Sequence, residues 1–218
     1  MVRPDFSDYV VHFTKETSPY GLAAKRKTVD GLAEISGMSA YERLLKILDG
    51  KVIRATNMPH THDPCVCFTE CVWGSLLDHA QRYSCYGLGF DKKLLFGAGG
   101  GPAFYMRQDL FAAVRKLPRA SIKDLWPFIT PFVPRYASEE HLDEYWPKKG
   151  YLDFSFEREW RVPRDFAFAL SDVSFVVVNS YTDEAKMPRE IKDAVGRENV
   201  ILMENYRRVN QLWPWHHY

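Results

Sequence analysis

The chain has 218 residues, of which 46% are hydrophobic and 15% aromatic, a composition that excludes a disordered chain and predicts one ordinary folded domain. Its 29 basic and 28 acidic residues leave a formal net charge of +1, so a nucleic-acid site would have to be a local patch. Apolar runs fall short of the roughly 20 residues that span a bilayer, and the start lacks the layout of a secretory signal, so we expect a cytoplasmic protein without membrane partners.

The first part of the chain predicts a strand and a well-capped helix. Residues 9–14 form a β-branched and aromatic run that ends before turn-forming residues, which is typical of a strand. Ser39 and Glu42 have the spacing of a capping box, and leucines at helical spacing continue to Asp49-Gly50. The other elements expected here are a loop with a turn or two of helix at 21–37, strands at 51–55 and 65–70, and a helix at about 73–83.

The second part predicts short strands that wander between helices. The expected elements are strands at 86–90 and 102–106 joined by a hairpin loop with glycines at 97–101, a helical region at 108–132, an irregular segment at 133–150, strands at 154–162, 175–179 and 200–203, a helix at 188–195, and an aromatic tail at about 204–218. Repeats and low-complexity linkers are missing from the sequence. We therefore expect a single α+β domain over residues 1–218.

The four cysteines all fall in one stretch, at Cys65, Cys67, Cys71 and Cys85, a poor layout for stapling a secreted fold. His60 and His62 lie close before Cys65 and Cys67, which keeps a zinc site open as an alternative. However, Cys65-x-Cys67 lies in a strand-like run rather than in a knuckle turn, and this favours buried reduced thiols and no metal.

Three pairs of polar residues lie within apolar strands and need an explanation, because burying a polar group without a hydrogen-bond partner costs free energy. His12 and Thr14 alternate on one strand and would share a face; a hydrogen-bonded core histidine is the simpler interpretation. Thr69 and Glu70 end the strand expected at 65–70, where helix capping also accounts for Glu70. Glu157 and Glu159 would share a face within an aromatic run, suited to proton transfer or to stabilising a cation, or else to Glu–Arg pairs on a solvated sheet face.

Taken in order, the motifs resemble a known group of proteins. His-x-Thr at 12–14, Leu-Leu-x-Ile-Leu-x-Gly at 44–50, Cys-Phe-Thr-Glu at 67–70, Tyr-Gly-Leu-Gly-Phe at 86–90 and Glu-x-Glu-Trp-Arg at 157–161 resemble the AbiGi-like abortive-infection proteins of phage defence. Their layout is similar in turn to the DarT-type ADP-ribosyltransferases that modify nucleic acid. The resemblance implies an ADP-ribosyltransferase-like split β-sheet of short strands flanked by helices, with NAD as the substrate.

The resemblance also implies roles for individual residues. His12 and Thr14 would contact the ribose and the nicotinamide region of NAD, Phe68 and Thr69 would line the pocket, and Tyr83 or Tyr86 would stack on nicotinamide. Glu159 would stabilise the cation that forms as nicotinamide leaves, and Glu157 would orient or deprotonate the acceptor, a nucleic acid or a protein. Arg54 and Arg82 are the candidates for the auxiliary arginine of nucleic-acid-modifying relatives.

Two other classes of function stay open. One is a non-enzymatic antitoxin, sensor or binding partner of a cognate toxin or defence protein, which would use the aromatic residues Trp213, Trp215 and Tyr218 as interface anchors. The other is a nuclease that uses His12 with His60 or His62 and Glu159. A Phe-Thr-Glu sequence at 68–70 in place of a Ser-Thr-Ser run is consistent with a member that keeps the fold and has lost the reaction.

Overall fold

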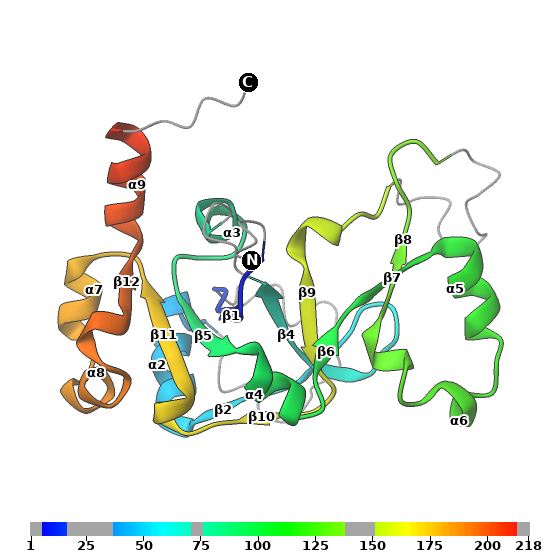
Figure 1. Ribbon diagram of the computed structural model, residues 1–218, viewed down its shortest axis with the longest axis horizontal. Coiled ribbons are helices and arrows are strands. Elements are labelled where there is room, and N and C mark those ends of the chain that lie inside the picture. The colour runs from blue at the N-terminus through cyan, green and yellow to red at the C-terminus, as the bar shows by residue number, and fades with distance from the viewer. Residues whose placement is uncertain (1–5, 17–36, 71–75, 138–150, 213–218) are drawn as a thin grey trace. The chain divides into compact units, whose positions relative to one another are not determined.

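The structure is a computed structural model that describes residues 6–16, 37–70, 76–137 and 151–212 (Figure 1). Its mixture of short strands and helices confirms the α+β class. The described residues group into two compact units: the first is drawn from residues 1–52, 71–94 and 167–218, and the second from residues 53–70 and 95–166. Each unit is described by itself. No helix in the described ranges is long and apolar enough to cross a membrane.

The first unit contains four strands that pair in the order β12-β11-β5-β1. Their bounds are Val200–Leu202 for β12, Val173–Val178 for β11, Gly87–Asp91 for β5 and Tyr9–Phe13 for β1. The β11–β12 pair is parallel, whereas β5 pairs antiparallel with both β11 and β1, so the strands are mixed in direction. All four strands were expected from β-branched and aromatic runs in the sequence.

Five α-helices belong to the described part of the first unit: α2 at Ala40–Gly50, α3 at Leu76–Arg82, α7 at Tyr181–Lys186, α8 at Arg189–Val195 and α9 at Met203–Leu212. The capping box of α2 is confirmed, because the Glu42 N–H donates to Ser39 Oγ and the Ser39 N–H donates to a Glu42 carboxylate oxygen. Helix α9 corrects the expected tail, since its residues are helical up to Leu212; residues 213–218 lie outside the described residues. Two short 3-10 turns complete this unit, at Leu170–Asp172 and Arg197–Asn199.

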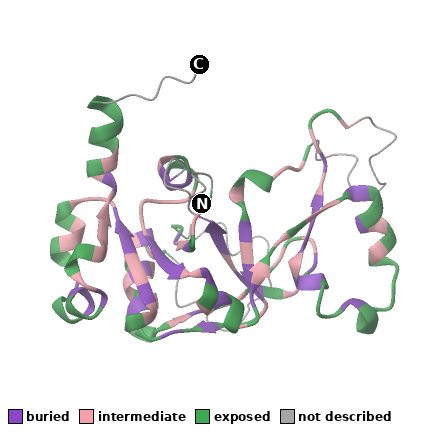
Figure 2. Ribbon diagram, in the orientation of Figure 1, coloured by how far each residue is buried: buried purple, intermediate pink, exposed green. Residues whose placement is uncertain are grey.

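Apolar side chains hold α3 and α9 against one face of these strands. Val11 of β1, Val177 of β11, Leu76 and Ala80 of α3 and Met203 of α9 form one buried cluster. Figure 2 shows the strands of this unit largely in the buried colour and the outer sides of α7, α8 and α9 exposed. This arrangement packs Val11 of β1, the strand that carries His12, against α3 and α9.

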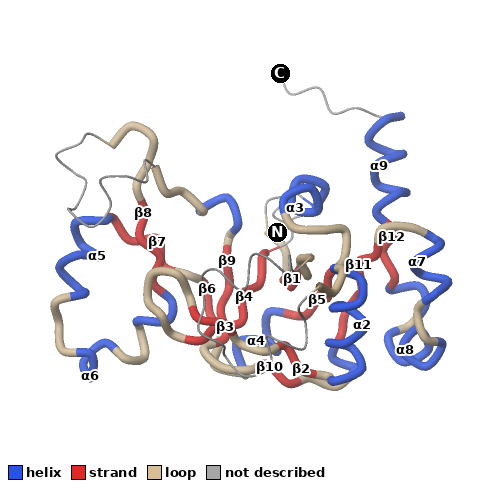
Figure 3. The backbone as a smooth tube through the Cα atoms, turned by 180° about the vertical axis from the view of Figure 1, so that it is seen from behind, coloured by secondary structure: helices blue, strands red, loops and turns tan. Residues whose placement is uncertain are grey.

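The second unit contains an antiparallel set and a parallel pair of strands. The antiparallel set runs β3-β4-β9-β6, with bounds Thr56–Asn57, Pro64–Glu70, Glu159–Val162 and Gly101–Pro102. The parallel pair is β7 at Phe104–Arg107 and β8 at Ile129–Phe132. Along the chain between β7 and β8 come α5 at Gln108–Arg115 and α6 at Arg119–Ile122, both labelled in Figure 3, and a 3-10 turn at Trp126–Phe128. Helix α4 at Lys92–Gly97 and the short strands β2 at Val52–Ile53 and β10 at Phe166–Ala167 span the divisions between the units.

The structure corrects the expected hairpin between residues 86–90 and 102–106. Strand β5 leads directly into α4, and β7 pairs with β8 instead. A local cap explains the helix, because Asp91 Oδ1 accepts from the backbone N–H of Lys93 at 2.7 Å and the Leu-Leu-Phe run that follows favours helical packing. Gly97 is therefore the last residue of a helix, Gly99 and Gly100 follow that helix, and Gly101 begins β6.

Two further expectations are corrected in the second unit. Residues 129–132 form strand β8 rather than the end of a helix, since Pro127 interrupts the helical hydrogen bonds and a β-branched and aromatic run follows. The strand expected at 154–162 begins only at Glu159, because Asp153 accepts from the backbone N–H of Ser155 at 2.9 Å and starts a 3-10 turn at Ser155–Glu157. Arg158 then takes a left-handed conformation, with φ of 43°, which leads the chain into β9.

Some expected elements lie outside the described residues: the loop at 21–36, the start of the helix at 73–75 and the irregular segment at 138–150. Residue 37 at the end of that loop is a turn, and residues 76–82 of the expected helix are confirmed as α3. The helix at 188–195 is confirmed as α8. The strand expected at 51–55 is shortened to β2, and the strand expected at 65–70 is confirmed as β4, which begins one residue earlier.

Candidate functional site

The pairing of β4 with β9 brings two predicted site residues together. Thr69 lies directly opposite Glu159, and Cys67 lies directly opposite Arg161. Opposed residues of an antiparallel pair point to the same face, so these four side chains share one face of the two strands. Both Thr69 and Glu159 are buried, at 7% exposure each.

Phe68 points to the other face of the same two strands. It lies opposite Trp160, is 1% exposed and packs edge-on against Phe166 with ring centroids 5.4 Å apart. Phe68 and Thr69 were predicted to line one pocket together, but their side chains lie on opposite faces of β4. Thr69 lies on the face of Glu159, whereas Phe68 contributes to the apolar core. Successive residues of a strand alternate between faces, which accounts for the division.

Arg161 holds the Glu159 carboxylate in place. Its Nε donates to Glu159 Oε1 at 2.9 Å and its Nη2 donates to Oε2 at 2.7 Å, a bidentate pair. The other guanidinium donors go to the carbonyl oxygens of Pro127 and Ile129 and to the hydroxyl of Thr130. All five N–H donors of this 1%-exposed side chain are therefore satisfied, as a buried cation requires.

Burial and the ion pair set the protonation of the groups on this face. Burial alone would lower the pKa of Arg161, but the hydrogen bonds and the charge of Glu159 outweigh it, and the pKa is raised. Burial raises the pKa of the Cys65 thiol to about 11, and burial together with the Glu159 charge raises that of Cys67 well above its usual value. Both thiols are thus protonated at neutral pH and are poor nucleophiles and metal ligands.

Tyr105 and Glu157 flank Glu159. The backbone N–H of Glu159 donates to the Tyr105 hydroxyl at 3.3 Å. Burial raises the pKa of Tyr105, and the charges of Glu159 and Glu157 add to the increase. Glu157 belongs to the 3-10 turn before β9, which corrects the prediction that both glutamates share a strand face. We call Thr69, Tyr105, Glu157, Glu159 and Arg161 the Glu159 cluster.

Glu70 lies beside this cluster at the end of β4. Its carboxylate is 3.8 Å from a guanidinium nitrogen of Arg158, and its backbone N–H donates to the Arg158 carbonyl at 3.2 Å. Residues 71–75, which follow it, lie outside the described residues, so the helix cap predicted for Glu70 stays a prediction.

His12 and Thr14 belong to the first unit. His12 is half-buried and lies opposite Leu88 of β5. Thr14 follows the last residue of β1 and is 1% exposed; its hydroxyl donates to the carbonyl of Ala40 at 2.7 Å and lies 3.2 Å from that of Tyr86. The Thr14 hydroxyl therefore ties β1 to α2 within this unit, while its predicted role towards NAD stays a prediction.

The two candidate tyrosines take different positions. Tyr83 stacks on Phe13 with centroids 6.1 Å apart, and Phe13, the strand neighbour of His12, points to the opposite face from it. Tyr86 packs on Tyr41 at 5.4 Å, and its hydroxyl donates to Asp183 at 3.0 Å. Burial, and then the Asp183 hydrogen bond, raise the pKa of Tyr86 above its usual value.

Neither candidate arginine lies in the Glu159 cluster as described. Arg54 is exposed and forms an ion pair with Asp165 at 2.6 Å, and Arg82 is exposed at the end of α3. The cluster contains Arg161 instead, which the sequence analysis noted only as a neighbour of the glutamates. The signal was available, because Glu159 and Arg161 are two residues apart on a strand and so must share a face.

The histidines and cysteines considered for zinc do not assemble a site in the described ranges, where no group of three or more His, Cys, Asp or Glu side chains could hold a metal ion. Cys65 donates to the carbonyl of Pro127 at 3.6 Å, and Cys67 lies 3.4 Å from the sulfur of Met58. Of the described cysteines, Cys65, Cys67 and Cys85 are free thiols.

Comparisons with known proteins give no relative from which to assign a function: no family model matches the chain, and no curated protein or solved structure is significantly similar to it.

Proposed function

We propose that the protein is an ADP-ribosyltransferase-like enzyme of abortive-infection phage defence, with the split β-sheet core of that fold, which consumes NAD and uses Glu159 as its catalytic carboxylate. The observation that carries the proposal is the register of β4 and β9, which sets Thr69 directly opposite Glu159. The resemblance assigned a hydroxyl-bearing strand and a late glutamate to one pocket, and these two residues are cross-strand neighbours.

The proposed chemistry needs a fixed negative charge beside the ribose. Positive charge develops on the ribose only as the bond to nicotinamide breaks, so a preorganised carboxylate favours the transition state over the ground state. Arg161 fixes the plane of the Glu159 carboxylate through two hydrogen bonds, and a carboxylate has about four lone-pair sites, so acceptor capacity remains for a ribose hydroxyl. Arg161 is then a positioning residue.

Glu157 is proposed to orient or deprotonate the acceptor, with nucleic acid as the first acceptor to test. It lies on the turn that precedes β9, two residues before Glu159, and its charge contributes to the rise in the pKa of Tyr105. The contributions of His12, Thr14, Tyr83 and Tyr86 to NAD binding are separate predictions, each testable by a single substitution in the same assay.

The test is release of nicotinamide from NAD by the purified chain, alone and with single-stranded DNA, double-stranded DNA or RNA. We expect turnover by the wild type and its loss, by a factor of at least about 100, in Glu159→Gln, because the amide carries no charge to stabilise the ribose cation. Glu157→Gln should retain release of nicotinamide in water but lose transfer to the acceptor.

Protein stability must be measured alongside, because Glu159→Gln weakens a buried ion pair. Circular dichroism and thermal unfolding identify the fraction of each variant that is folded, and turnover is expressed per folded molecule. Glu190→Gln, on the exposed surface of α8, is the matched control, since it removes a carboxylate outside the Glu159 cluster and should turn over as the wild type does. An unchanged turnover in folded Glu159→Gln would remove this residue from the catalytic role.

A binding protein that keeps the fold without the reaction is the second candidate. It is favoured by the complete internal satisfaction of Arg161 and of the Thr14 hydroxyl, which accounts for two of the polar placements by structure alone. Affinity purification from cells should then recover a stoichiometric partner that is lost on substitution of Trp213 or Trp215, and NAD should be left intact with every acceptor.

A further inference from the structure

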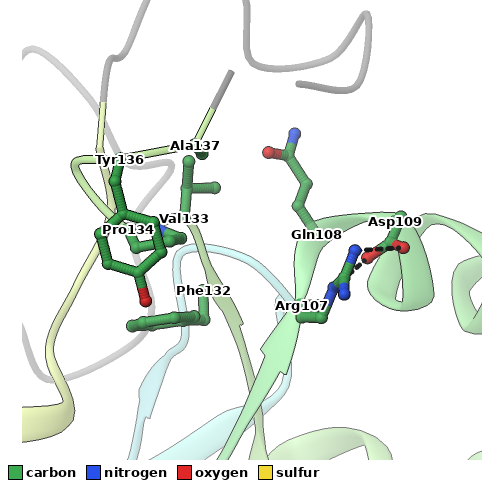
Figure 4. A pocket seen from close by; sticks show the side chains of 8 residues that line it. All are labelled: Arg107, Gln108, Asp109, Phe132, Val133, Pro134, Tyr136 and Ala137. Carbon is green, nitrogen blue, oxygen red and sulfur yellow. Dashed lines mark hydrogen bonds and ion pairs between the residues drawn. The ribbon is translucent and has the colours of Figure 1, made fainter. Parts of the chain in front are cut away.

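A cavity of about 310 Å³ lies in the second unit, and none of its lining residues belongs to the Glu159 cluster (Figure 4). One side is the junction of β7 with α5, and the other is the end of β8 with the residues that follow it. The two strands are parallel, with Arg107 opposite Phe132, so both carboxyl ends open onto the cavity. Small ligands commonly bind at the carboxyl ends of parallel strands, in pockets of about 300–1,000 Å³.

Gln108 marks this cavity as a binding site. Its side chain lines the cavity and is only 3% exposed, yet neither its amide nitrogen nor its amide oxygen has a hydrogen-bond partner among the described residues. Figure 4 shows the carboxamide extending from the start of α5 on the side opposite Val133 and Tyr136. More than about 90% of buried polar groups are hydrogen-bonded. A buried carboxamide without hydrogen bonds therefore indicates a ligand that supplies them.

The lining residues restrict the chemistry of that ligand. A carboxamide offers one acceptor and two donors in a plane, and its complement is a planar edge with a donor beside an acceptor. Phe132 and the 87%-exposed Tyr136 provide aromatic faces for stacking. Arg107 donates to Asp109 at 3.2 Å through two nitrogens, so its charge is compensated, and the cavity is better suited to a base than to a phosphate.

We propose that this cavity binds an adenine ring, with the Gln108 carboxamide accepting from the exocyclic amino group and donating to the adjacent ring nitrogen. Adenine presents this donor and acceptor side by side, and a Gln side chain pairs with that edge through two hydrogen bonds. The ring comes either from a free adenine nucleotide or from a base of a single strand. The inference does not rest on the proposed function, because it requires neither Glu159 nor turnover of NAD.

Isothermal titration calorimetry of the full chain with adenosine monophosphate, N6,N6-dimethyladenosine monophosphate, oligo(dA) and an abasic oligonucleotide of equal length tests the proposal. We expect adenosine monophosphate or oligo(dA) to bind, and the dimethylated and abasic forms to bind about tenfold more weakly or less, because dimethylation removes the N–H that the carboxamide oxygen would accept and the abasic strand has no ring. Binding of the mononucleotide indicates a free nucleotide as the source, whereas binding of oligo(dA) alone indicates a single strand. Failure of both adenine probes, or equal binding of the dimethylated nucleotide, overturns the proposal.

Gln108→Leu should lower adenine affinity about tenfold while leaving the free energy of unfolding unchanged or higher, because it removes an unsatisfied buried amide. Gln211→Leu, on the exposed surface of α9, is the matched control and should bind as the wild type does. Wild-type affinity in Gln108→Leu overturns the assignment. If Gln108→Leu does not fold, Phe132→Leu replaces it; weaker stacking should then reduce affinity, and unchanged affinity overturns the proposal.

Discussion

Strand β11 of the first unit and strand β9 of the second are buried to the same degree by opposite means. Val176, Val177 and Val178 of β11 are 0% exposed and pack through apolar contact alone. Arg161 of β9 is 1% exposed and depends on five directional hydrogen bonds. Apolar burial is non-directional, whereas a buried guanidinium is stable only while each hydrogen-bond partner stays in place. The second unit should therefore be the more sensitive to single polar substitutions.

Arg161→Met should produce the largest loss of stability. The substitution leaves the buried Glu159 carboxylate without its partner, and breaking a buried pair from one side costs about 3–5 kcal/mol. Urea denaturation followed by circular dichroism measures the loss. Val177→Ala in β11 should cost less, about 2 kcal/mol, from lost burial and a small cavity. A smaller effect for Arg161→Met than for Val177→Ala would reverse the contrast between the two strands.

Gly89→Ala should show that the first unit also contains a position that does not accept one additional methyl group. A Cβ at this glycine would lie 2.4 Å from the ring of Phe175, which packs over it from β11. Overpacking of this kind costs about 1–3 kcal/mol, measured as a lower midpoint of urea denaturation. Gly97→Ala, where nothing lies within 4 Å of the added atom, is the control and should be close to neutral. Combining Gly89→Ala with Phe175→Leu should restore part of the loss.

The buried thiol of Cys65 should make the second unit sensitive to alkaline pH. Its pKa is raised by burial to about 11, above the value of about 9 expected when the chain unfolds. Below pH 9 the thiol is protonated in both states and contributes no pH dependence; between pH 9 and 11 it ionises only in the unfolded state, so stability falls by at most about 1.4 kcal/mol per pH unit. Cys65→Val should flatten this part of the pH profile, and an identical profile would contradict the assignment.

Ser39→Ala should give the smallest effect, because the capping box of α2 lies at an exposed helix end. Loss of the N-cap hydrogen bond costs about 1 kcal/mol. Thermal unfolding of Ser39→Ala and of Ser39→Asp, which retains an N-cap acceptor, separates the cap from other effects of the substitution. A loss as large as that of Arg161→Met would show that the exposed cap outweighs the buried pair.

Short-range signals in the sequence predicted much of the fold. The capping box fixed the start of α2 at Ala40, and β-branched runs located β11 and β12 to within two residues, because these patterns depend on neighbouring residues. Errors occurred where a single side chain changed the backbone. Asp91 started helix α4 where a hairpin was expected, and Asp153 started the turn that shortens β9.

The candidate site was predicted less well because it depends on pairing between distant strands. The sequence indicated Thr69 and Glu159 separately, and only the β4–β9 register makes them neighbours. A Glu–Arg pair was considered only on a solvated sheet face, because arginine is mostly exposed and no local pattern indicates a buried one, whereas the pair of Glu159 with Arg161 is buried. The carbonyl oxygens that complete its hydrogen bonds come from residues more than 30 positions away along the chain.

The alternation of charged and aromatic residues along β9 has a consequence for how the second unit assembles. If β9 slid by one residue against β4, Arg161 would exchange faces with Trp160 and enter the apolar layer that contains Phe68 and Phe166. A bare cation in that layer carries a penalty of several kcal/mol, so the misaligned pairing would be rejected during folding. Arg161 therefore favours the observed pairing of β9 with β4 over a pairing shifted by one residue, and this effect does not depend on the function of the unit.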